Sequence, residues 1–152
     1  MTYQGSRGLD RGRTALPAPP VGGPPRVDYE AIIVRGDARV LVDTAERLGK
    51  DLANARLTTS QIRGVFGTVR QIEMNWSASA TEGRQRQAQR QLILLKPKLA
   101  YQARRQSGGA VQQLADALNP AIDLVGEDRE RFRNFVDFFE AILAYHKAAG
   151  GR

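Results

Sequence analysis

The sequence contains no cysteine and a single histidine among its 152 residues. Without cysteine there is no disulfide framework, no thiol nucleophile and no thiolate metal site. The chain also lacks a Walker-type Gly-Lys-Ser/Thr, a G-x-S-x-G and a His/Cys cluster for zinc. The one histidine, His146, falls on the apolar side of a predicted helix, where we expect a packed role. We therefore expect a protein that is not an enzyme and that needs no cofactor.

Long hydrophobic runs are also missing. No apolar run approaches the about 18 residues that a membrane span requires, so we expect no membrane contact. The first residues, MTYQGSRGLDRGR, contain no apolar segment of the kind found in secretory signals, which favours a cytoplasmic location. The hydrophobic content of 41% is typical of a globular domain, and the length leaves room for one domain with a tail.

Positive charge is concentrated in one block. Residues 56–105 contain ten basic residues against two acidic ones, whereas residues 27–55 contain four against six and residues 110–150 contain four against seven. A localised basic block raises the local potential and attracts polyanions. The block indicates contact with nucleic acid, and the alternative is a solvated helix face that happens to be basic.

The chain divides into a tail and a helical domain. Residues 1–26 include LPAPPVGGPPR, a composition that cannot bury enough apolar surface to offset the entropy of ordering. We expect a disordered tail over residues 1–26 and a helical RNA-binding domain over residues 27–150.

The periodicity after Asp37 is helical, and no segment alternates with the period of a strand. The fold class that follows is all-α, a compact bundle of about five helices. The predicted helices cover residues 37–55, a segment that starts at Thr58, residues 85–105, residues 110–125 and residues 127–147.

Local signals mark several boundaries. Thr58 and Gln61 have the spacing of a capping box, which predicts a helix start at Thr58. Pro97 lacks an N–H group, so we expect a kink or a restart near Lys96. Residues 110–125 are expected as one or two short helices, interrupted at Asn119-Pro120.

Two helices show clear core-facing stripes at the i, i+3, i+4, i+7 spacing. Gly64 and Gly67 interrupt the first of them, weaken it and leave its backbone open to close approach. The first stripe is Ile62, Val65, Phe66, Val69, Ile72 and Trp76, and the second is Phe132, Phe135, Val136, Phe139, Ile142, Leu143 and His146.

The basic residues are spaced for phosphate contact. Arg63 and Arg70 are seven residues apart and project from one side of their helix. Lys98, Tyr101 and Arg105 share a side of the next helix. A guanidinium fork donates two hydrogen bonds to a phosphate, and a tyrosine ring can stack on a base.

Three sequence blocks resemble a known family. LTTSQIR (57–63), LKPKLAYQARR (95–105) and FFEAILAYHK (138–147) occur in the order found in the small subunit of type III-A CRISPR effector complexes, the Csm family. The likeness extends from about residue 38 to about residue 149. It implies a helical subunit without a catalytic role that stacks in several copies and lines the channel of the guide–target duplex.

The resemblance also implies partners and contact residues. The expected partners are target RNA, guide RNA, the repeated backbone subunit, the large polymerase-like subunit and further copies of the chain. Leu92, Leu94, Leu95 and Leu99 would anchor the third helix while its cations face the strand. The family commonly has glycine at the position of Arg104. The candidate RNA-binding residues are Arg63, Arg70, Lys96, Lys98, Tyr101, Arg104, Arg105 and Lys147.

Two other functions remain open from the sequence. A small helical DNA-binding regulator would place a recognition helix in the major groove, usually as a symmetric dimer. A protein adaptor would use the basic block to bind an acidic partner.

Overall fold

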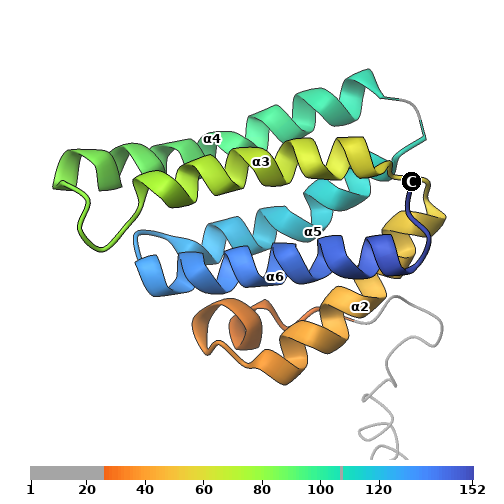
Figure 1. The fold of residues 1–152 in the computed structure, drawn as a ribbon, viewed down its shortest axis with the longest axis horizontal. Helices are drawn as coiled ribbons and strands as arrows, with labels where there is room; N and C mark the ends of the chain where they lie inside the picture. The colour runs from red at the N-terminus through yellow and green to blue at the C-terminus, as the bar shows by residue number, and fades with distance from the viewer. Residues whose placement is uncertain (1–25, 107) are drawn as a thin grey trace, which may run out of the picture.

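The computed structural model describes residues 26–106 and 108–152. The described part contains helices and no strand, which confirms the all-α prediction (Figure 1). The expected tail falls, except for Arg26, outside the described residues. The elements are the π-helix η1 (Glu30–Val34) and the α-helices α2 (Ala38–Asn54), α3 (Thr59–Asn75), α4 (Glu82–Arg105), α5 (Ala110–Val125) and α6 (Arg129–Ala148).

Four helices form a closed ring around the core. α3 packs on α4, α4 on α5, α5 on α6, and α6 back on α3. α2 lies against the outer side of α6, where it makes the most extensive helix–helix contact of the fold (Figure 1). η1 packs on α6, α5 and α2. This arrangement brings the start of α3 and the ends of α4 and α6 to one end of the molecule.

The predicted stripes form the core. Trp76 of α3 stacks on Phe132 of α6 with ring centroids 4.8 Å apart, and Phe66 meets Phe139 edge to face at 5.2 Å. Phe66 and Leu143 are only partly buried, and the other members of both stripes are buried. The sequence analysis missed Phe138, which is fully buried against Tyr29 next to η1. Each buried aromatic ring contributes about 1.5–3 kcal/mol relative to exposure.

One glycine sets the distance between α2 and α6. A Cβ atom at Gly49 would lie 2.7 Å from the backbone nitrogen of His146 and 2.7 Å from Cβ of Tyr145. Because real Cβ atoms do not approach other atoms so closely, only glycine permits this helix contact. The sequence analysis did not identify this position.

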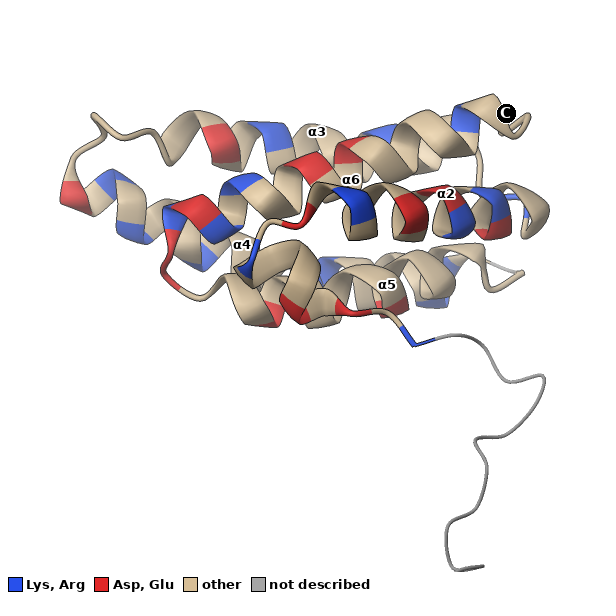
Figure 2. Cartoon of the chain, turned by 90° about the horizontal axis from the view of Figure 1, so that it is seen from below, with Lys and Arg blue, Asp and Glu red and all other residues tan. Residues whose placement is uncertain are grey.

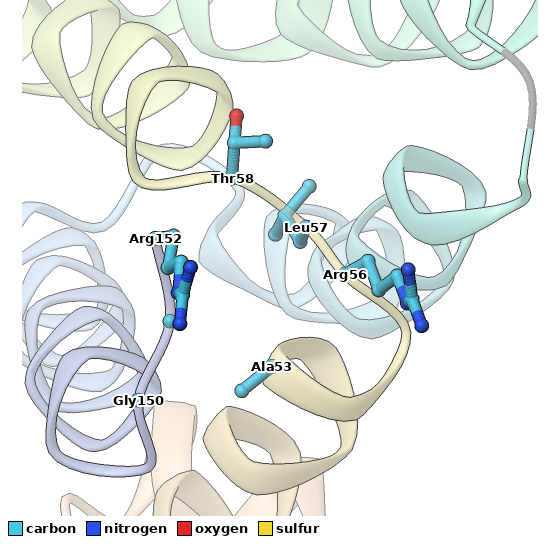
Figure 3. A pocket seen from close by; sticks show the side chains of 7 residues that line it. Ala53, Arg56, Leu57, Thr58, Gly150 and Arg152 are labelled. Atoms are coloured by element: carbon cyan, nitrogen blue, oxygen red, sulfur yellow. The ribbon is translucent and has the colours of Figure 1, made fainter.

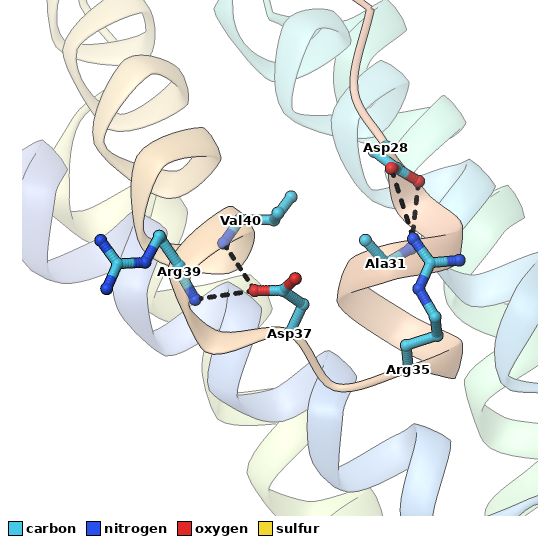
Figure 4. A network of polar contacts seen from close by, with 6 residues as sticks. All are labelled: Asp28, Ala31, Arg35, Asp37, Arg39 and Val40. Atoms are coloured by element: carbon cyan, nitrogen blue, oxygen red, sulfur yellow. Dashed lines mark hydrogen bonds and ion pairs between the residues drawn. The ribbon is translucent and has the colours of Figure 1, made fainter.

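Side-chain caps fix the helix starts. The capping box of Thr58 and Gln61 is present as predicted. Thr81 caps α4, so this helix begins at Glu82, three residues before the predicted start. Asp37 caps α2 by accepting from the N–H groups of Arg39 and Val40 (Figure 4).

η1 lies in a segment for which no helix was predicted. Asp28 holds this element through the N–H of Ala31 and through an ion pair with Arg35 at 3.5 Å (Figure 4). Its residues Ala31, Ile32 and Ile33 are buried.

Tyr29, directly before η1, is tied to α5. Its hydroxyl donates to the carbonyl of Ala117 at 2.8 Å. Burial and, to a smaller extent, the charge of Asp116 raise the pKa of this phenol.

Pro97 and Pro120 lie inside continuous helices. α4 does not restart near Lys96 and α5 is not interrupted at Asn119-Pro120, so the restart and the interruption were wrong predictions. The acceptors that lose a donor belong to Ile93 and Asp116, four residues before each proline. Both residues are exposed, so water can reach their carbonyl groups and the helices continue.

Within the residues that the structure describes, no helix is both long and apolar enough to cross a membrane. The described ranges also contain no group of three or more His, Asp or Glu side chains placed to hold a metal ion.

Candidate nucleic-acid interface

The first turn of α3 is the centre of the candidate interface. Leu57 is buried directly before this turn, and Thr58 caps it. The N–H of Thr59 donates to the main-chain oxygen of Arg152 at 2.7 Å, so residues from the other end of the described chain lie against the same turn. The start of a 17-residue helix carries partial positive charge, which favours anions nearby.

His146 locks the end of α6 to this turn. Its Nε2 lies 2.6 Å from the carbonyl oxygen of Leu57, and its side chain is buried. A carbonyl oxygen only accepts hydrogen bonds, so Nε2 carries the proton and donates. Gly151 covers the other side of the ring, where a Cβ atom would lie 2.2 Å from Cε1. The predicted packed role of His146 is confirmed.

Arg105 reaches the same end from α4. The side chain of Gln61, in the first turn of α3, donates a hydrogen bond to the side chain of Gln106, the residue that ends α4. At the other end of the same hairpin, Asn75 of α3 contacts Gln91 and Arg84 of α4. α3 and α4 are therefore antiparallel neighbours, which places Arg63 and Arg105 at one end of the bundle.

Lys147 joins this group from α6. Arg63 and Lys147 line one pocket of about 250 Å³, together with Thr59 and His146. Both cations are exposed. The structure thus brings together three predicted residues, Arg63, Arg105 and Lys147, from three different helices.

Two arginines that the sequence analysis did not select complete this surface. Arg56 and Arg152 are exposed and line a pocket of about 450 Å³ together with Leu57 and Thr58 (Figure 3). Arg56 also lines a neighbouring pocket of about 380 Å³ with Gln61. We call the five cations Arg56, Arg63, Arg105, Lys147 and Arg152 the basic end of the bundle.

No acidic side chain of the described residues lines the pockets of the basic end. The three pockets around the first turn of α3 are lined by described residues among which there is no Asp and no Glu. Along α2 and α6, by contrast, basic and acidic residues are interspersed, as Figure 2 shows. Cations without nearby carboxylates keep their hydrogen-bonding capacity for an external anion.

α4 extends the basic surface away from this end. It carries seven basic residues and only one acidic residue, Glu82 in its first turn. Lys98, Tyr101 and Arg105 share a side of this helix, as predicted from their spacing. Tyr101 is 64% exposed, and the Arg105 guanidinium lies 5.6 Å from the centre of its ring. This cation–π contact orients both side chains outward together.

Three other predicted residues lie apart from this group. Lys96 pairs with Asp123 of α5 at 2.6 Å, on the opposite side of α4 from Lys98. Arg70 pairs with Glu73 at 2.9 Å and lies 5.9 Å from the Phe66 ring. Arg104 is exposed on a different side of α4 from Arg105, because successive helical residues differ by about 100°.

Gly64 and Gly67 leave open space beside the backbone of α3. A Cβ atom added at Gly64 or Gly67 would have no other atom within 4 Å. The helix backbone is therefore open to a ligand between Arg63 and Arg70.

On α4, Leu92, Leu95 and Leu99 are buried anchors as expected, whereas Leu94 is 40% exposed and does not anchor the helix.

The comparisons with known proteins agree with this architecture. A model of the family described as Csm2 Type III-A matches residues 35–152, more than half of the chain. A search of curated proteins and a search of solved structures each returned no match. The family match begins just before α2 and includes every helix of the ring as well as the basic end. The chain therefore belongs to the Csm2 family, the small subunit of type III-A CRISPR effector complexes.

Proposed function

We propose that this protein is a non-catalytic structural subunit that holds the target RNA of a type III-A CRISPR ribonucleoprotein by its backbone, without sequence specificity. In this role it lines the channel of the guide–target duplex in the cytoplasm. Its partners there are the guide RNA, the repeated backbone subunit, the large polymerase-like subunit and further copies of itself.

The observation that carries the proposal is the basic end. Arg56, Arg63, Lys147 and Arg152 line the pockets around the first turn of α3, Arg105 lies at the same end of the bundle, and no described Asp or Glu lines these pockets. Arginine forks and a lysine suit phosphate oxygens, whereas reading a base sequence needs amide or guanidinium groups aimed at base edges inside a groove. A subunit that must accept any guide sequence is expected to contact the backbone.

Tyr101 adds a contact that does not depend on sequence. Its exposed ring is held beside Arg105 on the surface that leads away from the basic end. Every base has a π-face, so an aromatic platform next to a cation accepts any nucleotide. For the free subunit this arrangement favours an unpaired RNA strand, and it offers no recognition helix of the kind that a regulator reading a DNA duplex needs.

Salt titration of RNA affinity tests the proposal. Fluorescence anisotropy with oligouridine and with a mixed-sequence RNA of equal length is expected to give similar affinities. If about four phosphates are neutralised, log affinity falls against log salt with a slope near −2.8, or roughly 50-fold between 50 and 200 mM. A preference for one defined DNA duplex, or no RNA binding at low salt, would contradict the proposal.

A pair of double variants locates the contact. Arg63→Ala with Arg105→Ala is expected to flatten the salt slope by about 1.4, since each phosphate contributes about 0.7 for a single strand. Arg39→Ala with Arg133→Ala removes the same charge from exposed positions on α2 and α6, each more than three helical turns from the basic end. This control is expected to leave the slope unchanged. Equal slopes for both double variants would show that the RNA does not use the basic end.

A further inference from the structure

We infer that Arg56 and Arg152 form a notch that binds one phosphate group, and that this phosphate belongs to the RNA strand on the basic end. The inference rests on the proposed function for the source of the phosphate. Neither the predicted site residues nor the family match assigns a role to these two arginines.

The notch is a cavity lined by two cations. Arg56 and Arg152 stand on either side of a pocket of about 450 Å³, within the range of about 300–1,000 Å³ that small-ligand sites occupy (Figure 3). Thr58 lines the same pocket. Its hydroxyl oxygen accepts from the N–H of Gln61 at 3.1 Å, so its own proton is left to donate.

No Asp or Glu side chain in the described part of the chain neutralises the notch. No carboxylate of the described residues lies within ion-pair distance of either guanidinium, although five other cations of this chain have such partners. The remaining lining residues are Ala53, Leu57, Gly150 and Gly151. Two guanidinium groups and a hydroxyl supply the donors that a phosphate needs.

The backbone at Arg56 has an unusual conformation. Arg56 follows α2 with φ of +69°, the only positive φ among the described non-glycine residues. The N–H of Arg56 bonds to the carbonyl of Ala53, and that of Leu57 to the carbonyl of Leu52. This is the Schellman pattern, in which glycine is the usual residue. Glycine would be less strained at this position, but the residue is an arginine. The Arg56 side chain lines two pockets.

The notch also lies on a continuous path of cations. Arg56 shares one pocket with Arg152 and a second pocket with Gln61, whose side chain bonds to the residue after Arg105. A strand that contacts Arg105 therefore passes Gln61 on its way to the notch. This continuity makes an RNA phosphate the ligand that the surroundings favour over an isolated anion.

Substitutions at Arg56 separate binding from folding. Arg56→Gly removes the guanidinium and relieves the strained φ, so the melting temperature is expected to stay level or rise by up to about 4 °C. Arg56→Ala removes the same group and keeps the strain, so its melting temperature is expected to be the lower of the two. Both variants are expected to flatten the RNA salt slope equally, by about 0.7, while Arg56→Lys and Arg39→Ala retain it. If RNA affinity rose and fell with melting temperature across these variants, Arg56 would have a structural role only. That result would refute the phosphate notch.

A double variant tests whether one phosphate is shared. If both arginines hold the same phosphate, then Arg56→Gly, Arg152→Ala and their combination each flatten the slope by about 0.7. If the double variant flattened the salt slope by about 1.4, the two arginines would bind separate phosphates. If no variant changed the slope, the RNA would not occupy the notch. Either result would overturn the inference while leaving the proposed function intact.

A second probe distinguishes failure of the proposed function. Inorganic phosphate is expected to shift the NMR signals of the Arg56 and Arg152 Nε–H groups together in the wild-type protein. If the protein bound no RNA but these two signals still moved, the proposed function would be wrong and the notch would stand as a phosphate site. If inorganic phosphate moved neither signal, the notch would be refuted.

Discussion

The buried imidazole of His146 donates a hydrogen bond of 2.6 Å to the carbonyl of Leu57, 89 residues earlier in the sequence. This contact joins the end of α6 to the turn before α3. It therefore fixes the position of Lys147 relative to Arg63, and it supports the basic end without facing solvent itself.

Replacement of His146 is expected to destabilise the fold. His146→Ala leaves the Leu57 carbonyl without its donor and opens a cavity under Gly151, for a combined loss of about 2–4 kcal/mol in the free energy of unfolding. Chemical denaturation measures this loss. Tyr101→Ala serves as the control, because its exposed ring leaves no cavity and its effect is expected to stay within about 0.5 kcal/mol. A His146→Ala variant as stable as the control would show that the contact does not hold α6 to the turn.

Two glycine substitutions are expected to have opposite effects. Gly49→Ala places a Cβ atom 2.7 Å from the α6 backbone, so α2 and α6 must move apart, at a cost of about 1–3 kcal/mol. Gly67→Ala meets no atom within 4 Å on an exposed helix and is expected to stabilise the protein by about 0.5–1 kcal/mol.

The melting temperatures of the two glycine variants provide the test, and RNA titration adds a second reading. If the strand approaches the open α3 backbone, Gly67→Ala weakens RNA binding even though it stabilises the fold. A destabilised Gly67→Ala, or a Gly49→Ala variant as stable as the wild type, would contradict the packing described for these helices.

Two lysines of α4 are expected to differ although only Pro97 separates them. Lys98 is exposed on the side shared with Tyr101 and Arg105, whereas Lys96 pairs with Asp123 on the opposite side. Lys98→Met is therefore expected to flatten the salt slope by about 0.7, and Lys96→Met to leave it unchanged. An equal effect of both substitutions would mean that the strand wraps around α4 or that the basic block acts only through its total charge.

The helices were predictable because their signals are local. The capping box at Thr58 and the stripes of α3 and α6 depend on spacing within a few turns, and the structure confirms them. The restart near Lys96 and the interruption at Asn119-Pro120 are absent for a tertiary reason. Burial of the opposite helix face, at residues such as Leu95 and Leu118, keeps α4 and α5 continuous while solvent reaches the unpaired carbonyl groups.

The candidate interface was predictable only in part. Spacing placed Lys98, Tyr101 and Arg105 on one side of a helix, but it could not place Lys96 next to Asp123, because that pair depends on how α4 packs on α5. Arg56 was missed because a positive φ after a helix is usually signalled by a glycine, and this position holds an arginine instead. Arg152 was missed because its backbone hydrogen-bond partner, Thr59, is 93 positions away.

The basic end has a consequence for the order of events during synthesis. It is held together by contacts between residues 57–59 and residues 146–152, separated by about 90 positions along the chain. Contacts between residues so far apart in the sequence form late in folding, after the local helices. An unfinished chain that lacks residues 146–152 therefore has the α3 and α4 cations but neither the His146 contact nor the completed pockets. Under the proposed function, such a chain is expected to hold RNA more weakly and with less order than the finished one.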